Sequence, residues 1–215
     1  MIGLQGELGL RERKKQRTRE TISKAAAALF LASGFDRVSV AEVADASEVS
    51  RRTLFAYFPT KEDLVVHRFA EQETASGRVV LEHADQPPLT ALSEHFLAGL
   101  ARRDAVTGLD DRPETLALRE MIATTPALAA RMLWFNVGAE RFLADALVQT
   151  TGAQPFTARL AAAQIVAVLW TLAVDNGAML IAGMSAAERY PDAVCAAERG
   201  FAMLRGGLDI APLAG

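Results

Sequence analysis

Two adjacent arginines, Arg51 and Arg52, stand at the head of a short apolar segment, SRRTLFAYFPTKEDL, over residues 50–64. Guanidinium groups at the end of a short helix can contact base edges or phosphates of a nucleic acid. The same groups on a surface helix often only improve solubility, and the pair by itself favours neither interpretation. The choice depends on the elements that hold the two side chains.

Side chains typical of catalysis or metal binding show no productive spacing. The three histidines, His67, His83 and His95, have no H-x-x-x-H pattern, and Cys195 is the single cysteine. The sequence contains no glycine-rich phosphate loop and no G-x-S-x-G motif. We therefore expect no enzymatic activity, no cofactor and no metal site. A metal sensor built on His67 and His95 stays open as a minor alternative to surface or capping histidines.

Charge is divided unevenly along the chain. Residues 1–64 hold 11 Lys or Arg and 9 Asp or Glu, whereas residues 65–215 hold 12 and 17, so a net charge of −3 separates into +2 and −5. The positive charge is densest over residues 11–24. This asymmetry predicts that the N-terminal part meets a polyanion and that the rest does not.

Length and composition favour a cytoplasmic protein. A chain of 215 residues with 51% hydrophobic side chains can bury one core or form a small and a larger domain. The N-terminus lacks the order of a secretory signal. The longest uncharged apolar run, Ile165–Val174, has ten residues, which is half of the roughly 20 that span a bilayer. We expect no membrane association.

Helices are predicted for the N-terminal part. A first helix should end near Ser33 with Gly34 as its C-terminal cap. A capping box of Ser39 and Glu42 starts a second helix, which should run to about Ala46. The apolar residues at helical spacing in the first helix are Ile22, Ala25, Leu29 and Phe30.

A third helix of barely two turns follows. Ser50 is its predicted N-cap, Leu54 and Phe58 form its apolar face, and Pro59 ends it. Thr60 should then cap a fourth helix. Two short helices joined by a tight turn form a helix-turn-helix, whose second helix can enter a DNA major groove with the two arginines against bases or phosphates.

The stretch RTRETISKAAAALFLASGFDRVSVAEVADASEVSRRTLFAYFPTKEDLV, residues 17–65, resembles the tetracycline-repressor (TetR) family of transcriptional regulators. The resemblance rests on an A-x-x-L-F run, a Gly-Phe pair and the closing YFPTKEDL. It implies that one set of residues lies over the major groove and a second set lies near the DNA backbone. The first set is Ser50, Arg51, Arg52 and Thr53, and the second is Thr18, Ser39, Phe55, Tyr57 and Lys61.

Two residues depart from the family pattern. Phe55 stands where many members have tyrosine, so it can pack on a sugar but cannot donate a hydrogen bond to a phosphate. Glu48 stands where many members have glycine, which implies either a left-handed backbone at this residue or a different turn.

The resemblance implies an all-α protein with an N-terminal three-helix helix-turn-helix DNA-binding domain and a C-terminal helical ligand-binding and dimerisation domain. We expect a disordered arm over 1–10, the DNA-binding domain over 11–65, the second domain over 66–205 and a tail over 206–215. The implied function is a ligand-responsive repressor that binds a palindromic double-stranded DNA operator as a homodimer. A small molecule would release it by shifting the fourth helix. The alternative is a helical small-molecule-binding protein or enzyme with an incidental basic segment.

Local signals predict long helices in the C-terminal part. The expected ranges are Lys61–His83, Leu89–Thr107, Glu114–Thr124, Pro126–Thr151, Phe156–Met184 and Pro191–Leu204. Small residues at Ala193, Ala196, Ala197 and Gly200 indicate close helix packing. In the resembling family the last two long helices form the dimer interface, and an internal helix pair is the alternative.

An apolar or aromatic effector is the last expectation. Aromatic and polar side chains of the C-terminal part could line a cavity of the kind that small molecules occupy. Gln164, Thr171 and Asp175 form one polar stripe, which belongs to the core, to a dimer interface or to this cavity, and a cationic effector would fit if Asp175 faces it. The candidate lining residues are Phe96, Met121, Trp134, Phe135, Gln164, Trp170, Asp175 and Asn176.

Overall fold

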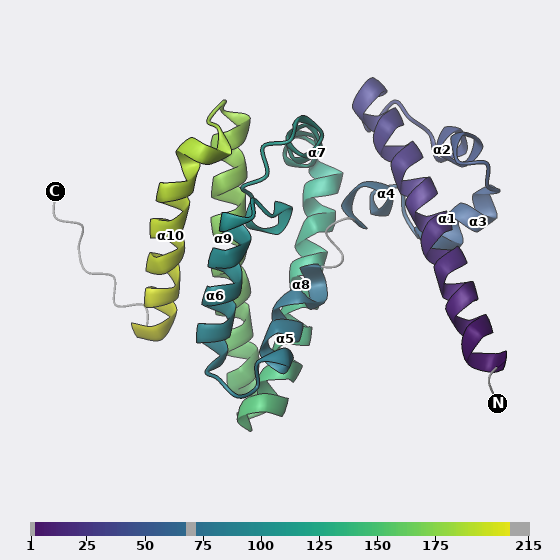
Figure 1. The fold of residues 1–215 in the computed structure, drawn as a ribbon. Coiled ribbons are helices and arrows are strands. Elements are labelled where there is room, and N and C mark those ends of the chain that lie inside the picture. Colours follow the sequence, from purple (N-terminus) through teal and green to yellow (C-terminus); the bar gives the residue numbers. More distant parts are fainter. Residues whose placement is uncertain (1–2, 68–71, 207–215) are drawn as a thin grey trace. The chain divides into compact units, whose positions relative to one another are not determined.

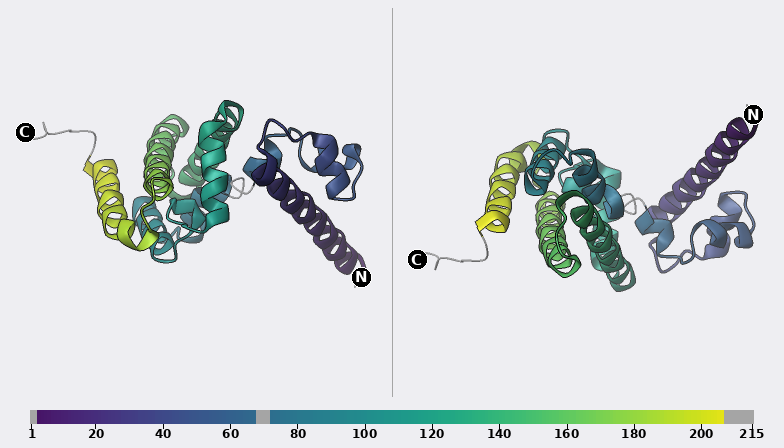
Figure 2. Two further views of the ribbon diagram at one scale, coloured as in Figure 1. Left: turned by 90° about the horizontal axis from the view of Figure 1, so that it is seen from above. Right: turned by 90° about the horizontal axis from the view of Figure 1, so that it is seen from below.

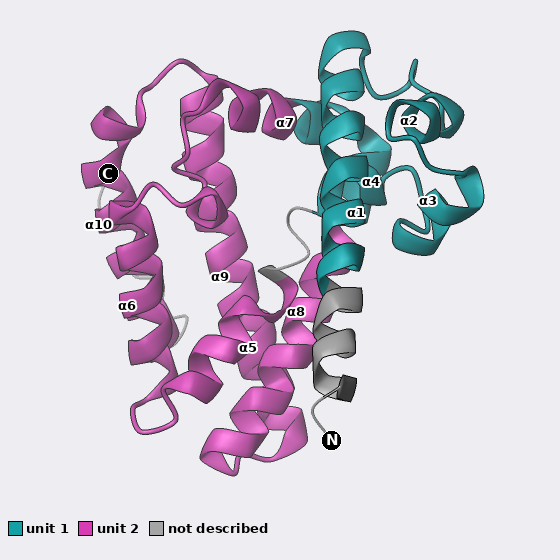
Figure 3. Ribbon diagram, turned by 45° about the vertical axis from the view of Figure 1, so that its right-hand side comes forward, with its two compact units in different colours: residues 1–68, 121–131 teal, residues 69–120, 132–215 magenta. Residues whose placement is uncertain are grey.

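The computed structural model describes the backbone of residues 3–67 and 72–206, and the side chains of residues 13–67 and 73–206. Within these ranges all long elements are helices, which confirms the all-α prediction (Figure 1). The chain divides into two compact units, one of residues 1–68 and 121–131, the other of residues 69–120 and 132–215 (Figure 3). The first unit thus includes Met121–Arg131, which the sequence analysis placed in the C-terminal domain.

The first unit contains four helices near the N-terminus: α1 (Gly3–Ser33), α2 (Val40–Ala46), α3 (Arg51–Tyr57) and α4 (Asp63–Val66). Their ends follow the predicted caps, and Gly34 has a φ of 87° with its N–H donating to the carbonyl of Phe30. The backbone is helical from Gly3, where the sequence analysis expected a disordered arm over residues 1–10; residues 1–2 lie outside the described part.

The core of this unit is formed by apolar side chains from all four helices. Phe30 and Phe35 pack with ring centroids 5.3 Å apart, and both rings are buried. The short helices are stable because each of them buries its apolar face against α1 and its neighbours. The fully or almost fully buried residues include Ile22, Ala26, Phe30, Val43, Leu54, Phe58, Leu64 and Val66.

The second unit is a bundle of longer helices. Its elements are α5 (Gln72–Glu82), α6 (Pro88–Ala101), the short 3-10 helix η2 (Ala105–Thr107), α7 (Pro113–Thr124), α8 (Pro126–Thr151), α9 (Pro155–Ile181) and α10 (Ala186–Gly206). The last residues of α7 and the first of α8 belong to the first unit. Residues 68–71, where the predicted helix Lys61–His83 would continue, and 207–215 of the predicted tail lie outside the described residues.

The start of α10 corrects the sequence analysis. We expected the helix to begin at Pro191, but it begins at Ala186 and carries Pro191 inside it. The physical reason is a cap at Ser185, whose backbone N–H donates to Glu188 Oε2 at 2.9 Å while the N–H of Glu188 donates to Ser185 Oγ at 3.3 Å. Pro191 removes one backbone hydrogen bond from the second turn, and the buried residues Ala193, Ala197 and Phe201 that follow it hold the helix in place.

The small residues of α10 pack inside the chain. Ala193 and Ala197 are 0% exposed, and a Cβ added to Gly200 would lie 2.9 Å from Cγ1 of Val168 on α9. Helix α10 packs against both α6 and α9 (Figure 2). At these positions the structure therefore shows an internal helix pair, which was the alternative to a dimer interface.

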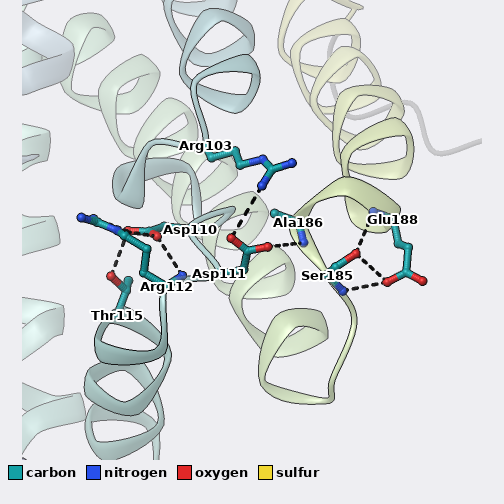
Figure 4. A network of polar contacts seen from close by, with 8 residues as sticks. All are labelled: Arg103, Asp110, Asp111, Arg112, Thr115, Ser185, Ala186 and Glu188. Atoms are coloured by element: carbon teal, nitrogen blue, oxygen red, sulfur yellow. Dashed lines mark hydrogen bonds and ion pairs between the residues drawn. The ribbon is translucent and has the colours of Figure 1, made fainter.

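Carboxylates order the loop between α6 and α7 (Figure 4). Asp110 accepts hydrogen bonds from Arg112 and, at 2.9 Å, from the Thr115 hydroxyl. Asp111 accepts one from the backbone N–H of Ala186 at 3.0 Å and lies 3.8 Å from Arg103. Burial acts to raise the pKa of Asp110, but the hydrogen bonds from Arg112 and Thr115 outweigh burial and hold the pKa below 3.8. The loop is thereby fixed to both α7 and α10.

Candidate nucleic-acid interface and ligand cavity

Helix α3 exposes two arginines to solvent, while its N-cap and its buried apolar face fix it to the core. Ser50 Oγ accepts a hydrogen bond from the backbone N–H of Thr53 at 3.0 Å, which confirms the predicted cap. Leu54 and Phe58 are 0% exposed and fix one side of the helix to the core. Arg51 and Arg52 are exposed at its first turn. The helix therefore offers two guanidinium groups on a rigid support.

The turn before α3 is shaped by two local features. The predicted capping box of α2 is present, with the Ser39 N–H donating to Glu42 Oε2 at 2.7 Å and the Glu42 N–H donating to Ser39 Oγ at 3.2 Å. Glu48 has a φ of 55°, so this residue takes the left-handed conformation that the sequence analysis gave as one of two outcomes. The hydrogen bond from Ser39 holds the pKa of Glu42 below 4.5.

Lys61 is positioned by aromatic rings. Its Nζ lies 4.3 Å from the ring centroid of Phe35 and 5.8 Å from that of Phe30, which is within the range of cation–π attraction. The adjacent turn is fixed by Thr60 and Asp63, each of which accepts a hydrogen bond from the other's backbone N–H. These contacts restrict the positions that the Lys61 ammonium group can take.

The remaining residues of the two predicted sets lie on or near the surface of the first unit. Phe55 is 46% exposed and Tyr57 is half-buried. Thr18 is half-buried, and its hydroxyl donates to the carbonyl of Lys14 at 3.0 Å. The exposed basic residues of α1 in the described part are Arg13, Lys14, Lys15, Arg17 and Lys24, and the side chain of Arg11 lies outside the described part.

An ion pair joins α4 to the start of α8 within the first unit. Arg131 Nη2 and Nε each lie 2.7 Å from Asp63 Oδ1, and the Asp63 carboxylate is 7% exposed. A charge pair with so little solvent around it is expensive to break by removing one partner. The same helix α8 then continues into the second unit, where it reaches a cavity.

The second unit contains a cavity of about 110 Å³ between α5, α6, η2, α8 and α9. Two residues of the predicted set, Phe96 and Trp170, line it. Three polar side chains that sequence reasoning did not assign to it also line it: Ser76, His95 and Asn136. The rest of the lining is apolar and consists of Ala75, Leu92, Val106, Ala139, Val166, Leu169 and Ala173.

Other members of the predicted set lie away from this cavity. Trp134 is 67% exposed, on the far face of α8 from the core. Phe135 is half-buried and Met121 belongs to the first unit; neither lines the cavity. Helical periodicity placed these residues on α7 and α8, but spacing alone could not say which side of a helix faces the cavity.

The predicted polar residues of α9 also have other roles. Asp175 pairs with Arg189 of α10. Asn176 is 1% exposed, donates to the carbonyl of Thr107 at 2.9 Å and accepts from Arg189 Nε at 3.0 Å. Gln164 is exposed beside a surface groove between α6, α9 and α10. A cationic effector held by Asp175 is therefore not supported, because this carboxylate already has a cation.

The histidine that lines the cavity stands at its rim. His95 is exposed on one side, and burial of the other side, followed by the charge of Arg102, lowers its pKa below 6.5. The only sequence signal for its role was its position next to Phe96. Among the described residues, no three His, Cys, Asp or Glu side chains come together as a metal site would require.

Helix α9 carries an uncovered apolar stripe. It is long and apolar enough to cross a membrane by length and composition, yet the most apolar window is only 28% buried in the single chain. The exposed stripe runs along its length and includes Phe156, Leu160, Gln164, Ala167, Thr171, Val174, Ala178 and Ile181.

Comparison with known proteins agrees with this geometry. The family described as "Bacterial regulatory proteins, tetR family" matches residues 22–67, which contain the helix-turn-helix. The transcriptional regulator TcmR of Streptomyces glaucescens, named as HTH-type, is 35% identical over 127 residues. The match covers 58% of this chain, and the chain spans little more than half, 56%, of the relative.

Solved structures share the fold along most of the chain. FadR of Thermus thermophilus has a TM-score of 0.55 at 22% identity, covering 92% of this chain and 99% of that one. NalD of Pseudomonas aeruginosa has a TM-score of 0.53 at 19% identity, covering 87% and 97%. At these identities the likeness concerns the fold. Together with the helix-turn-helix match and the sequence relative, it makes the chain similar to the TetR family of bacterial regulatory proteins.

Proposed function

We propose that the protein is a transcriptional repressor that binds a palindromic DNA operator as a homodimer and releases it when a small molecule binds. The observation that carries this proposal is α3, a capped helix with a buried apolar face and two exposed arginines at its first turn. A helix of this kind fits the major groove, which is about 12 Å wide. The alternative, a binding protein or enzyme with an incidental basic segment, does not account for this arrangement.

A second copy of the chain is the partner that the stripe on α9 supports. Phe156, Leu160 and Val174 are 69%, 50% and 47% exposed in the single chain. An apolar face of this length marks an interaction surface in a protein that does not aggregate. A two-fold dimer also places two recognition helices one DNA turn, about 34–36 Å, apart, as reading of a palindrome requires.

A route from the cavity to the DNA-binding unit runs along α8. This helix contributes Asn136 and Ala139 to the cavity and Arg131 to the ion pair with Asp63 of α4. A ligand that shifts α8 would act on the same helix that holds α4. It can change DNA affinity only by as much as its own affinity differs between the two arrangements.

Fold relatives support the regulatory part of the proposal. FadR is a TetR-family transcriptional repressor whose structure was solved in complex with lauroyl-CoA, and NalD is a secondary repressor of a multidrug efflux pump. Proteins of this family are regulators rather than enzymes, and a DNA-binding regulator in a bacterium acts in the cytoplasm. We extend these roles to the present chain as a proposal.

A mobility-shift experiment tests the proposal. The purified protein is titrated into duplex DNA from the region flanking its own coding sequence, in parallel with the variants Arg51→Ala, Arg52→Ala and Arg141→Ala. Arg141 is exposed on α8 in the second unit and serves as the matched control. We expect the free energy of DNA binding to weaken by roughly 1–3 kcal/mol when an arginine that reads a guanine edge is replaced, and to stay unchanged for the control. Equal binding by all four proteins would contradict the proposal.

A further inference from the structure

We propose that the cavity of the second unit takes a small uncharged ligand with a single aromatic ring and one hydrogen-bonding group, and that it rejects carboxylate and ammonium analogues of that ligand. The biological meaning of this inference rests on the proposed function, in which the cavity is the effector site. Its binding test needs no DNA.

The lining explains why charge is rejected. Leu92, Phe96 and Val166 are buried residues that line the cavity, and Trp170 is a further part of its lining. No Asp, Glu, Lys or Arg is among the described residues that line it. An ion that entered would lose water without gaining a counter-charge, which costs several kcal/mol in an apolar site. Aromatic surface, in contrast, gains contacts with two aromatic side chains.

Three polar side chains explain why one hydrogen-bonding group is accepted. Ser76, His95 and Asn136 come from three different helices, α5, α6 and α8, and all three are partly exposed. A hydroxyl, a neutral imidazole and an amide can each donate and accept hydrogen bonds. A ligand hydroxyl near the rim would find partners there while its ring lies on the apolar base.

The size of the cavity sets the size of the ring system. Its volume is about 110 Å³. An engineered apolar cavity of about 150 Å³ in another protein holds benzene. One ring with a short substituent that projects past the partly exposed rim fits this space, and two fused rings do not.

The cavity cannot widen easily at the η2 end. Gly108, with a φ of 82°, packs so closely on α9 that an added Cβ would overlap the carbonyl group of Ala173. Asn176 fixes the same loop through its hydrogen bond to the carbonyl of Thr107. Val106, which lines the cavity, is therefore held against α9 by backbone contacts.

The wall between α5 and α8 is fixed by close contact as well. A Cβ added to Gly77 would lie 2.7 Å from Cε1 and 3.1 Å from the carbonyl oxygen of Phe142, and one added to Gly138 would lie 2.5 Å from Cδ of Glu73. The two helices thus meet at glycines on both sides. The Phe142 ring and the Glu73 side chain occupy the space beside these glycines, so larger residues there would push against them.

Fluorescence of Trp170 tests the inference. The chain has two tryptophans, so Trp134→Phe leaves Trp170 as the single reporter on the cavity wall. The full-length variant is titrated at pH 8 with benzyl alcohol, benzoate, benzylammonium and 1-naphthalenemethanol, and thermal stability is followed in parallel. We expect a saturable response to benzyl alcohol, affinities at least about tenfold weaker for the two ions, and no saturable response to the naphthyl alcohol.

Two cavity variants and one control locate the binding. Ala139→Leu should fill the cavity and abolish the response, whereas Ala98→Leu, on the exposed face of α6, should leave it unchanged. Leu169→Ala should enlarge the cavity and admit 1-naphthalenemethanol. The enlarged variant keeps the test decisive if the filled variant does not fold.

The outcomes separate this inference from the proposed function. Binding of either ion as tightly as benzyl alcohol, a saturable response to the naphthyl alcohol in the Trp134→Phe protein, or no response to benzyl alcohol at millimolar concentration overturns the inference. Saturable binding of benzyl alcohol that leaves DNA affinity unchanged supports the inference and counts against ligand-controlled DNA release.

Discussion

Replacing Gly108 by alanine should destabilise the second unit far more than the same change at Gly152. Both glycines have positive φ values, 82° and 69°, so alanine at either position costs about 1–2 kcal/mol of left-handed strain. At Gly152 nothing lies within 4 Å of the added Cβ. At Gly108 the Cβ would lie 2.8 Å from the carbonyl carbon and 3.0 Å from Cα of Ala173, and these are backbone atoms of α9.

The contact with α9 adds a second penalty at Gly108 alone. Overpacking of this kind costs about 1–3 kcal/mol, so Gly108→Ala should lower the free energy of unfolding by about 2–5 kcal/mol in total. The entropy that alanine removes from the unfolded chain is common to both variants and cancels in their difference. The expected difference between the two variants is therefore about 1–3 kcal/mol.

Equilibrium unfolding in urea measures this difference. Trp170 emission, in a Trp134→Phe background, reports on the second unit, and circular dichroism reports on the whole chain. Equal losses for Gly108→Ala and Gly152→Ala would show that η2 does not rest on the backbone of α9, and the argument for a cavity of fixed size would lose its main support.

Three further predictions concern the first unit and the dimer. The pKa of Glu42 in the folded protein lies below its ordinary value of 4.5. Its hydrogen bonds with Ser39 therefore stabilise α2 fully above pH 4.5, and this stabilisation is lost as the pH falls through the folded pKa. Glu42→Gln should make the free energy of unfolding depend less on pH in this range. Lys61→Ala should reduce the salt slope of DNA binding by about 1, measured by fluorescence anisotropy, and an unchanged slope would remove Lys61 from the interface. Val174→Glu should yield monomers in sedimentation equilibrium, whereas Leu133→Glu, 58% exposed on α8, should not; the reverse pattern would place the dimer surface on α8.

Local signals in the sequence predicted the DNA-binding unit well. The caps at Ser39 and Ser50 and the C-terminal glycine at Gly34 each involve groups within four residues of one another, so the sequence alone shows both partners. Even the left-handed backbone at Glu48 was one of two stated outcomes. Such features do not depend on how distant helices pack.

The cavity could not be predicted in the same way. Asp175 pairs with Arg189, and Asn176 bonds the carbonyl of Thr107, 69 residues away. Only the packing of α9 against α10 and η2 brings these partners together. Trp134 shows the same limit, because it belongs to a helix with apolar residues on several sides and lies on the exposed one.

The boundary of α10 was predictable but missed. Ser185 and Glu188 have the spacing of a capping box, and Pro191 was given more weight than this signal. A proline inside a helix removes one hydrogen bond and crowds the preceding turn, but burial of Ala193, Ala197 and Phe201 beyond it offsets that cost in α10.

Hydroxyl-radical footprinting on a bound DNA fragment tests the central claim most directly. If two α3 helices of one dimer read the DNA, protection should appear as two patches related by a two-fold axis and centred about one helical turn, 10–10.5 base pairs, apart or a multiple of it. Arg51→Ala and Arg52→Ala should weaken both patches together. A single unsymmetric patch, or protection that survives both substitutions, would contradict the account.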